Sequence, residues 1–246
     1  MSTAGSETTL FHVTHWKAGS VWIEAILRSI APQRVVDVKP KAAHFRGSPV
    51  EPGSIYPRVY VTREVFDGVS LPEGAVRFVV IRDLRDTFIS TYFSLKFSHT
   101  TDQLPKILAA RKRLRSVSFK EGLEFTMTHP MVADSAAIQR SWIEAGEPLI
   151  RYEDLLENDA EILEHTLIDR CGLEVDPMRV RTAVLKNRFA AMSGGRTPGQ
   201  EDPFAHQRKG VAGEWRDHLR GSLKEQFKER WGDVLIAAGY EQDMDW

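Results

Sequence analysis

The run Val76-Arg77-Phe78-Val79-Val80-Ile81 constrains the fold of this chain more than any other segment. It is almost uninterrupted in apolar residues, and most of these are β-branched, which favours a strand over a helix. A strand without a polar face is typical of the centre of a parallel sheet, where helices cover both sides. The segment therefore predicts an α/β fold built around a strand at residues 76–81.

Shorter strand and helix patterns alternate along the rest of the chain. The predicted strands lie at residues 9–13, 34–38, 58–62 and 148–152. The predicted helices lie at residues 21–30, 83–97, 136–145, 153–171 and 176–192, with at least one more after residue 213. This alternation predicts three α/β/α layers around a central parallel sheet, and ligands of such folds bind beyond the carboxyl ends of the strands. The length suits a single domain over residues 1–246.

The composition limits which partners the protein can bind and which cellular compartment it suits. With 42% hydrophobic residues the chain can build a sizeable core, and its formal net charge of −1 argues against nucleic acid or a strongly anionic membrane as a partner. The only cysteine, Cys171, excludes an intramolecular disulfide and a cysteine-built zinc cluster, which fits a reducing compartment. Residues 1–9 lack the pattern of a secretory signal, and no apolar run approaches ~18 residues. We expect a cytoplasmic protein that binds neither membranes nor nucleic acid.

The segment from Thr14 to Trp22 joins the first predicted strand to the first predicted helix. Lys17, Gly19 and Ser20 lie where the helix begins, and the first N–H groups of a helix have no intrahelical acceptor and carry partial positive charge. Together with the lysine they can bind an anion such as a phosphate. The pattern differs from G-x-x-x-x-G-K-[ST], because Lys17 precedes Gly19. From this segment alone, a structural turn with an incidental lysine remains the alternative.

A second segment with anion-binding chemistry follows the strand at 76–81. Arg82 lies at the carboxyl edge of that strand, and Ser90 lies two helical turns further on, so both can face an anion near the first loop. The same spacing allows Arg82 to pair with Asp86 while Ser90 lies on a helix face. Both interpretations remain open.

Arg208 and Lys209 form a third segment, and Gly210 and Gly213 follow them. Two adjacent cations bounded by glycines make a flexible basic clasp that suits a dianionic phosphate. The alternative is a surface turn with solvated charges.

These three segments resemble, in order, the nucleotide-binding motifs of the cytosolic-type sulfotransferases, which use 3′-phosphoadenosine-5′-phosphosulfate (PAPS). Residues 14–22 resemble T-Y-P-K-S-G-T-T-W, residues 82–92 resemble R-N-P-x-D-x-x-V-S-x-Y, and residues 208–215 resemble R-K-G-x-x-G-x-W. Two shorter matches lie between them: residues 152–155 match Y-E-D-L, and residues 189–192 match F-x-x-M. Because all five follow the order of the family, the chain is similar to a shorter, divergent member of it.

The resemblance implies the sulfotransferase fold, with a P-loop-like phosphate-binding loop, and a role for individual residues. The residues implied around the 5′-phosphosulfate are Lys17, Ala18, Gly19, Ser20, Val21 and Trp22. Those implied around the 3′-phosphate are Arg82, Ser90, Arg208, Lys209 and Gly210. Those implied at the adenine are Tyr152 and the stretch 187–192, with Phe189 and Met192. Val21, Asn187 and Arg188 depart from the family's residues, and Phe189 with Met192 also fits an ordinary core contact one helical turn apart.

The resemblance also implies in-line transfer of the sulfuryl group from PAPS to a hydroxyl, or an amine, of a small-molecule acceptor. Lys17 would stabilise the charge that develops on the leaving phosphate, so no metal is required. The family's base is a histidine in a K-T-H-x-P context, and its nearest counterpart is His44 in Lys41-Ala42-Ala43-His44. A structural role for His44 is the alternative. The other candidate bases are His15, His99 and Glu64.

Two other functions remain open. An ATP-dependent P-loop kinase-type phosphotransferase would share the phosphate loop, but it needs a lysine after the loop glycines and a carboxylate for Mg²⁺. A non-catalytic protein that binds adenosine 3′,5′-bisphosphate (PAP) would share the nucleotide site without a base.

No motif specifies the acceptor or the oligomeric state. The aromatic residues that could form an acceptor wall, or belong to the core, are Phe45, Tyr56, Phe93, Phe97 and Phe125. The basic segment at 100–118 could be a solvated helix face, a mobile segment or a gate over the site.

Overall fold

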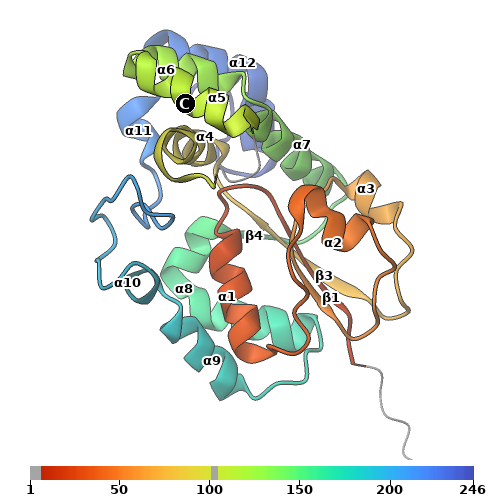
Figure 1. Cartoon of the computed structure of the whole chain (residues 1–246). Helices are drawn as coiled ribbons and strands as arrows, with labels where there is room; N and C mark the ends of the chain where they lie inside the picture. Colours follow the sequence, from red (N-terminus) through yellow and green to blue (C-terminus); the bar gives the residue numbers. More distant parts are fainter. Residues whose placement is uncertain (1–6, 101–104) are drawn as a thin grey trace, which may run out of the picture. The chain divides into compact units, whose positions relative to one another are not determined.

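The computed structural model describes residues 7–100 and 105–246, which form two compact units (Figure 1). Unit 1 takes its described residues from the ranges 7–81 and 138–188. Unit 2 takes them from the ranges 82–100, 105–137 and 189–246. The single domain expected from the length of the chain stays a prediction.

Unit 1 contains a parallel sheet of four strands among the described residues. The strands are β1 (Leu10–Thr14), β2 (Ile55–Val59), β3 (Val76–Ile81) and β4 (Leu149–Arg151), in the spatial order β2-β1-β3-β4. β3 has the predicted bounds, pairs with β1 on one side and β4 on the other, and buries its last four residues. The prediction of a buried internal strand is confirmed.

The prediction of a strand at residues 34–38 is wrong. Val35 makes one isolated bridge to Ile55, and the chain then leaves the sheet. In this register a longer ladder would need the N–H of residue 57 at the Val36 carbonyl oxygen, but residue 57 is proline and has none. The Arg28 guanidinium donates to that oxygen instead, at 3.3 Å.

The strand predicted at residues 58–62 begins earlier, as β2. It ends before Thr62 because this residue caps helix α3 (Arg63–Asp67): its hydroxyl oxygen accepts a hydrogen bond from the Val65 N–H at 3.4 Å. Two short elements that the sequence pattern did not predict, η1 (Pro40–Ala42) and α2 (Ala43–Arg46), precede β2.

Helices cover both faces of the sheet of unit 1 (Figure 1). On one face, α1 (Ser20–Ile30), α8 (Tyr152–Glu164), its π-helical extension η3 (His165–Arg170) and α9 (Pro177–Lys186) enclose an aliphatic core. That core includes Leu10, Ile23, Ile26, Leu27, Val80, Ile150, Leu155, Leu163 and Val184. On the other face, α2, α3 and the end of α7 (Pro130–Glu144) contribute to an aromatic cluster. Its members are Phe11, Phe45, Tyr56, Phe66 and Trp142. The predicted α/β/α layers are confirmed.

The described residues of unit 2 form helices and loops. The helices are α4 (Leu84–Phe93), the π-helical turn η2 (Ser94–Ser98), α5 (Pro105–Ser116), α6 (Phe119–Met127), the start of α7, α10 (Phe189–Met192), α11 (Trp215–His218) and α12 (Gly221–Ala237). Phe88 of α4 packs on Phe227 of α12 with 5.6 Å between ring centroids. In the basic segment, α5 buries Ile107, Ala110 and Leu114 and exposes most of its charged residues, while residues 101–104 lie outside the described ranges.

Three predicted helices are interrupted. The helix predicted at 153–171 changes from α8 to the π-helical η3 after Glu164. The helix predicted at 83–97 changes to a π-helical turn after Phe93. The helix predicted at 176–192 divides into α9 and α10 at Asn187, whose side-chain amide donates to the Ala183 carbonyl oxygen at 2.7 Å. The helix predicted at 136–145 begins earlier, at Pro130, as α7. Within residues 7–100 and 105–246, none of the helices has the length and apolar character needed to cross a bilayer.

Candidate functional site

The loop from Thr14 to Ser20, called the phosphate loop below, follows the carboxyl end of β1. The Thr14 hydroxyl donates to the Val80 carbonyl oxygen at 2.8 Å and so ties the start of the loop to β3. Lys17 has φ 67° and Gly19 has φ 78°, both in the left-handed region, which turns the chain sharply into α1. The N–H groups of the first turn of α1, which begins at Ser20, therefore follow Lys17 closely, as the sequence predicted.

Tyr152, from the junction of β4 and α8, packs against the phosphate loop. A Cβ atom placed on Gly19 would lie 2.9 Å from the Tyr152 ring, so the ring needs a glycine at this position. Trp22 meets the same ring edge-on, with 6.2 Å between centroids. Unit 1 thus brings Tyr152 together with the residues that the resemblance placed at the 5′-phosphosulfate.

Two residues that the sequence analysis did not select, Tyr60 and Arg58, also contact this loop region. The Tyr60 hydroxyl lies 2.6 Å from the Ser20 Oγ, and Trp16 packs on the Tyr60 ring with 4.8 Å between centroids. Arg58 donates from Nε to the Tyr60 oxygen at 3.1 Å and from Nη1 to Glu24 of α1 at 3.2 Å. Ser20 therefore ends a chain of polar contacts that begins at Glu24.

A bulge in β2 explains why Arg58 points this way. The pairing of β1 with β2 slips between Phe11 and Val13, so that Pro57 and Arg58 together lie opposite His12. Arg58 has φ 55°, which is unusual for a residue with a side chain. Bulges redirect side chains and often lie beside functional sites. The signal in the sequence was Pro57, because proline inside a strand pattern marks a bulge or an edge.

His44 supports the same bulge. Its Nε2–H donates to the Pro57 carbonyl oxygen at 2.9 Å, and its Nδ1 accepts from the Lys39 N–H at 3.3 Å. Burial lowers the pKa of His44, and the hydrogen bond to the Pro57 carbonyl oxygen only partly opposes the shift. The Nδ1 that accepts from Lys39 carries no proton, so the ring is neutral. Both ring nitrogens contact backbone, which is the structural role that the sequence analysis weighed against a catalytic one. His44 as a base stays a prediction.

The other candidate bases have different surroundings. His15 is buried, donates from Nδ1 to the Trp16 carbonyl oxygen at 2.9 Å and accepts from the Gln139 amide at 2.8 Å. His99, in unit 2, lies with Nδ1 3.3 Å from the Ser94 hydroxyl. Glu64 is exposed in the first turn of α3.

In unit 2, Arg82 and Asp86 join the second and third motif segments. Arg82 donates to the Val211 carbonyl oxygen at 3.1 Å and lies 3.8 Å from the Asp86 carboxylate, so the pairing weighed from the spacing is present. Asp86 also accepts from the backbone N–H groups of Gly213 at 2.6 Å and Trp215 at 2.9 Å. One buried carboxylate thus holds the third segment on α4. Ser90 lies one helical turn beyond Asp86 and is half-buried.

The two cations of the third segment are paired with carboxylates rather than solvated. Arg208 contacts Glu201 at 2.6 Å and makes two contacts to Glu214, and Lys209 lies 3.0 Å from Glu214. Burial raises the pKa of Glu214, but the hydrogen bonds and charges of Arg208 and then Lys209 outweigh it and lower that pKa to about 2. Glu214 is therefore ionised at neutral pH and orients both cations.

Arg196 organises the long loop that carries these cations, called the C-terminal loop (residues 193–214). Its guanidinium donates to the carbonyl oxygens of Gln200 at 2.9 Å, Gln207 at 2.5 Å and Arg208 at 2.8 Å. The Gly199 N–H adds a hydrogen bond to the Lys209 carbonyl oxygen at 2.8 Å. The expected flexible clasp is instead a loop with extensive internal hydrogen bonding.

Gly210 and Phe189 are in close contact in unit 2. A Cβ atom placed on Gly210 would lie 2.4 Å from the Phe189 ring, and Gly210 has φ 66°. Phe189 and Met192 are half-buried, and α10 has no buried residue, so the alternative of an ordinary core contact is wrong. The candidate acceptor-wall residues divide: Phe45 and Tyr56 belong to the core, whereas Phe93, Phe97 and Phe125 are half-buried.

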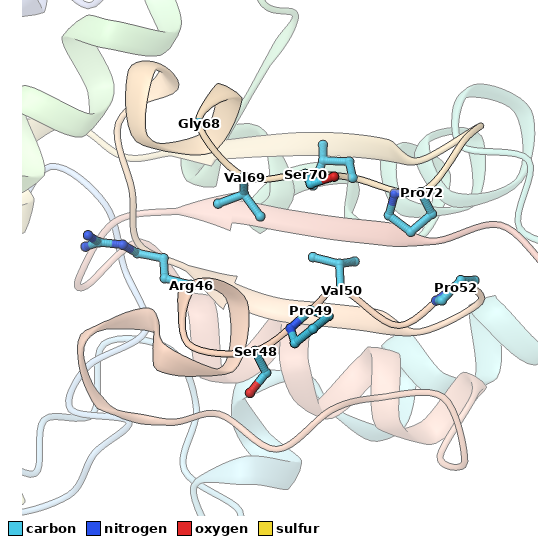
Figure 2. Close-up of a pocket in the computed structure, with 10 residues that line it drawn as sticks. Arg46, Ser48, Pro49, Val50, Pro52, Gly68, Val69, Ser70 and Pro72 are labelled. Atoms are coloured by element: carbon cyan, nitrogen blue, oxygen red, sulfur yellow. The ribbon is translucent and has the colours of Figure 1, made fainter.

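A groove of about 570 Å³ lies elsewhere in unit 1 (Figure 2). It is lined by residues from two segments, Arg46 to Pro52 and Gly68 to Pro72, which precede β2 and β3. These segments lead into the amino ends of the strands, whereas the phosphate loop follows a carboxyl end. The groove contains none of the residues predicted for the nucleotide site.

Comparisons with known proteins give matches in three-dimensional structure. No family model and no curated protein matches the sequence. The structure is similar to mouse sulfotransferase SULT7A1 complexed with PAP, at 15% identity and a TM-score of 0.65, over 96% of this chain and 88% of that one. It is also similar to retinol dehydratase with retinol and PAP, at 14% identity and a TM-score of 0.54, over 94% of this chain and 82% of that one. A retinol dehydratase complex with androsterone and the inactive cofactor PAP matches at 13% identity and a TM-score of 0.50, over 92% and 80%.

These matches extend over most of the chain, and they agree with the parallel sheet, its helical layers and the loop after β1. They confirm the fold that the sequence motifs implied. The chain has the fold of the sulfotransferases.

Proposed function

We propose that this protein transfers the sulfuryl group of PAPS to a hydroxyl, or an amine, of a small-molecule acceptor. The observation that supports this most strongly is the phosphate loop in a chain with the sulfotransferase fold. Its left-handed Gly19 lies against Tyr152 and admits no Cβ atom, so backbone N–H groups and Lys17 can approach a phosphate closely. The residues present therefore fit the 5′ end of the nucleotide.

For the 3′-phosphate we propose Arg82, Ser90, Arg208, Lys209 and Gly210. Arg208 and Lys209 are oriented by Glu214, so a bound phosphate would compete with that carboxylate for them. For the adenine we propose the residues that the sequence resemblance implies, Tyr152, Phe189 and Met192.

In the proposed reaction the acceptor oxygen or nitrogen forms a bond to sulfur as the bond from sulfur to the 5′-phosphate oxygen breaks. Lys17 and the first N–H groups of α1 stabilise the negative charge that the leaving phosphate gains. The acceptor's proton passes to a base, for which His44 is the candidate from the sequence. Its Nδ1 would have to release the Lys39 N–H before it could take a proton.

Nucleotide binding tests the proposed function first. PAP at about 100 times its dissociation constant is expected to raise the melting temperature by about 5–10 °C, because it binds the folded state only. Protection by ATP with Mg²⁺ but not by PAP would favour the kinase alternative instead.

Turnover separates an enzyme from a protein that only binds PAP. With PAPS and a panel of phenols, aliphatic alcohols and amines, the wild-type protein is expected to form sulfated product. Lys17→Met is expected to lower kcat at least about 100-fold through loss of charge stabilisation, while Lys112→Met on exposed α5 leaves it unchanged. PAP binding without any sulfated product would favour the non-catalytic alternative.

The role of His44 needs its own variant. If His44 is the base, His44→Gln loses turnover while PAP binding survives. Turnover that survives the substitution would refute His44 as the base and leave its role at the bulge.

A further inference from the structure

The chain of contacts Glu24, Arg58, Tyr60 and Ser20 favours one direction of hydrogen bonding. A guanidinium has only donors, so the Tyr60 oxygen accepts from Arg58 Nε at 3.1 Å. Within residues 7–100 and 105–246, the other hydrogen-bond partner of that oxygen is Ser20 Oγ at 2.6 Å. Because Arg58 already donates to the Tyr60 oxygen, the contact with Ser20 is best satisfied when the Tyr60 hydroxyl gives its proton to Ser20. Ser20 accepts it, and its own proton is left to donate outward.

Ser20 is the first residue of α1 and lies in the phosphate loop. An outward-pointing hydroxyl proton there adds a donor to the helix-start N–H groups and Lys17, all of which favour an anion. A serine hydroxyl that rotates freely would offer its proton to an anion only part of the time. A fixed donor avoids the ordering cost when the anion binds.

Unusual local structure supports this chain of contacts. Arg58 keeps a left-handed backbone, the bulge places Pro57 and Arg58 opposite one residue, and His44 binds the Pro57 carbonyl oxygen. Glu24 holds the far side of the guanidinium at 3.2 Å, and its side chain is only 14% exposed. Backbone in sparsely populated regions is energetically costly and is typical of functional sites.

We propose that Tyr60 is a positioning residue that fixes the Ser20 hydroxyl as a hydrogen-bond donor to the 5′-phosphate end of the nucleotide. This rests on the proposed function, because the anion at the phosphate loop is taken to be that of PAPS. Tyr60 acts through Ser20, so its effect is confined to ligands that carry a 5′-phosphate.

A double-mutant cycle tests the proposal. Affinity for PAP is measured by calorimetry for wild type, Tyr60→Phe, Ser20→Ala and the double variant. Ser20→Ala is expected to weaken binding about 10-fold and Tyr60→Phe about 3-fold to 10-fold, and the double variant is expected to match Ser20→Ala alone. Adenosine 3′-monophosphate, which has no 5′-phosphate, is expected to bind all four proteins equally.

Tyr56→Phe is the matched control, because it removes a phenol of β2, the strand that Tyr60 follows, and this phenol accepts from the Glu51 N–H at 2.8 Å. It is expected to leave PAP affinity unchanged. If Tyr60→Phe weakens the binding of PAP equally with and without the Ser20 hydroxyl, or weakens the binding of adenosine 3′-monophosphate as much, Tyr60 acts on the general fold and the proposal is overturned.

Should Tyr60→Phe not fold, Arg58→Gln replaces it. The double-mutant cycle of Arg58→Gln with Ser20→Ala tests the same series of hydrogen bonds. A wild-type protein that binds adenosine 3′-monophosphate and PAP equally, or neither, overturns the proposed function as well.

Discussion

His12 and His44 lie on either side of the bulge in β2 and differ in what their rings contact. Both ring nitrogens of His44 bind backbone groups. Those of His12 have no hydrogen-bond partner within the described ranges, and its ring stacks on Phe78 with 5.0 Å between centroids. Burial, and secondarily the charge of Arg58, lowers the pKa of His12 to about 3. His12 is thus a titratable residue in an apolar environment.

Because of this location, the free energy of unfolding depends on pH. The unfolded chain binds a proton at His12 below about pH 6.5, whereas the folded protein does so only near pH 3, so the folded state loses about 1.4 kcal/mol per pH unit between these values. His12→Leu removes that loss. We expect the difference in unfolding free energy between His12→Leu and wild type to grow by about 2 kcal/mol in favour of the variant as the pH falls from about 7.5 to about 5. Urea unfolding at each pH measures this difference. His165→Leu, at an exposed histidine, is the control, and parallel pH profiles for His12→Leu and wild type would contradict the expectation.

At the scale of elements, α10 and the C-terminal loop depend on each other. Gly210 leaves room for the Phe189 ring, and Arg196 donates to the Arg208 carbonyl oxygen. The Asp86 carboxylate of α4 accepts hydrogen bonds from two backbone N–H groups that follow Gly210. The sequence showed the basic residues of this loop. It did not show that Glu201 and Glu214 would pair with them, because those contacts depend on how the loop folds back.

Substituting the loop glycines separates backbone strain from the contact with Phe189. Gly210→Ala adds a methyl group 2.4 Å from the ring and a strained φ, and it is expected to weaken PAP binding at least about 10-fold. Gly199→Ala has a comparable strain at φ 96° but meets nothing within 4 Å, so it is expected to lower the melting temperature with a smaller loss of affinity. Equal losses of affinity in calorimetry would rule out a special role for the Phe189 contact.

At the scale of the whole molecule, stability is expected to vary between segments. β1 and β3 each pair with a strand on both sides, whereas β2 and β4 pair with one strand only and the C-terminal loop has many exposed residues. Amide exchange measured by mass spectrometry is expected to be slowest in β1 and β3 and fastest in residues 193–205. Slow exchange in that part of the loop, equal to that of β3, would show that the Arg196 contacts stabilise it as strongly as the sheet.

Local patterns in the sequence determined the fold class, the bounds of β3, the turn into α1 and the order of the basic segments. They did so because a strand, a left-handed glycine and a helix start depend on neighbours along the chain. Only the tertiary structure decided the bulge at Pro57 and Arg58, the hydrogen bonds of His44 and the carboxylate partners of Arg208. A one-residue slip between β1 and β2 reverses which way the following side chains point, and no short stretch of sequence records that pairing.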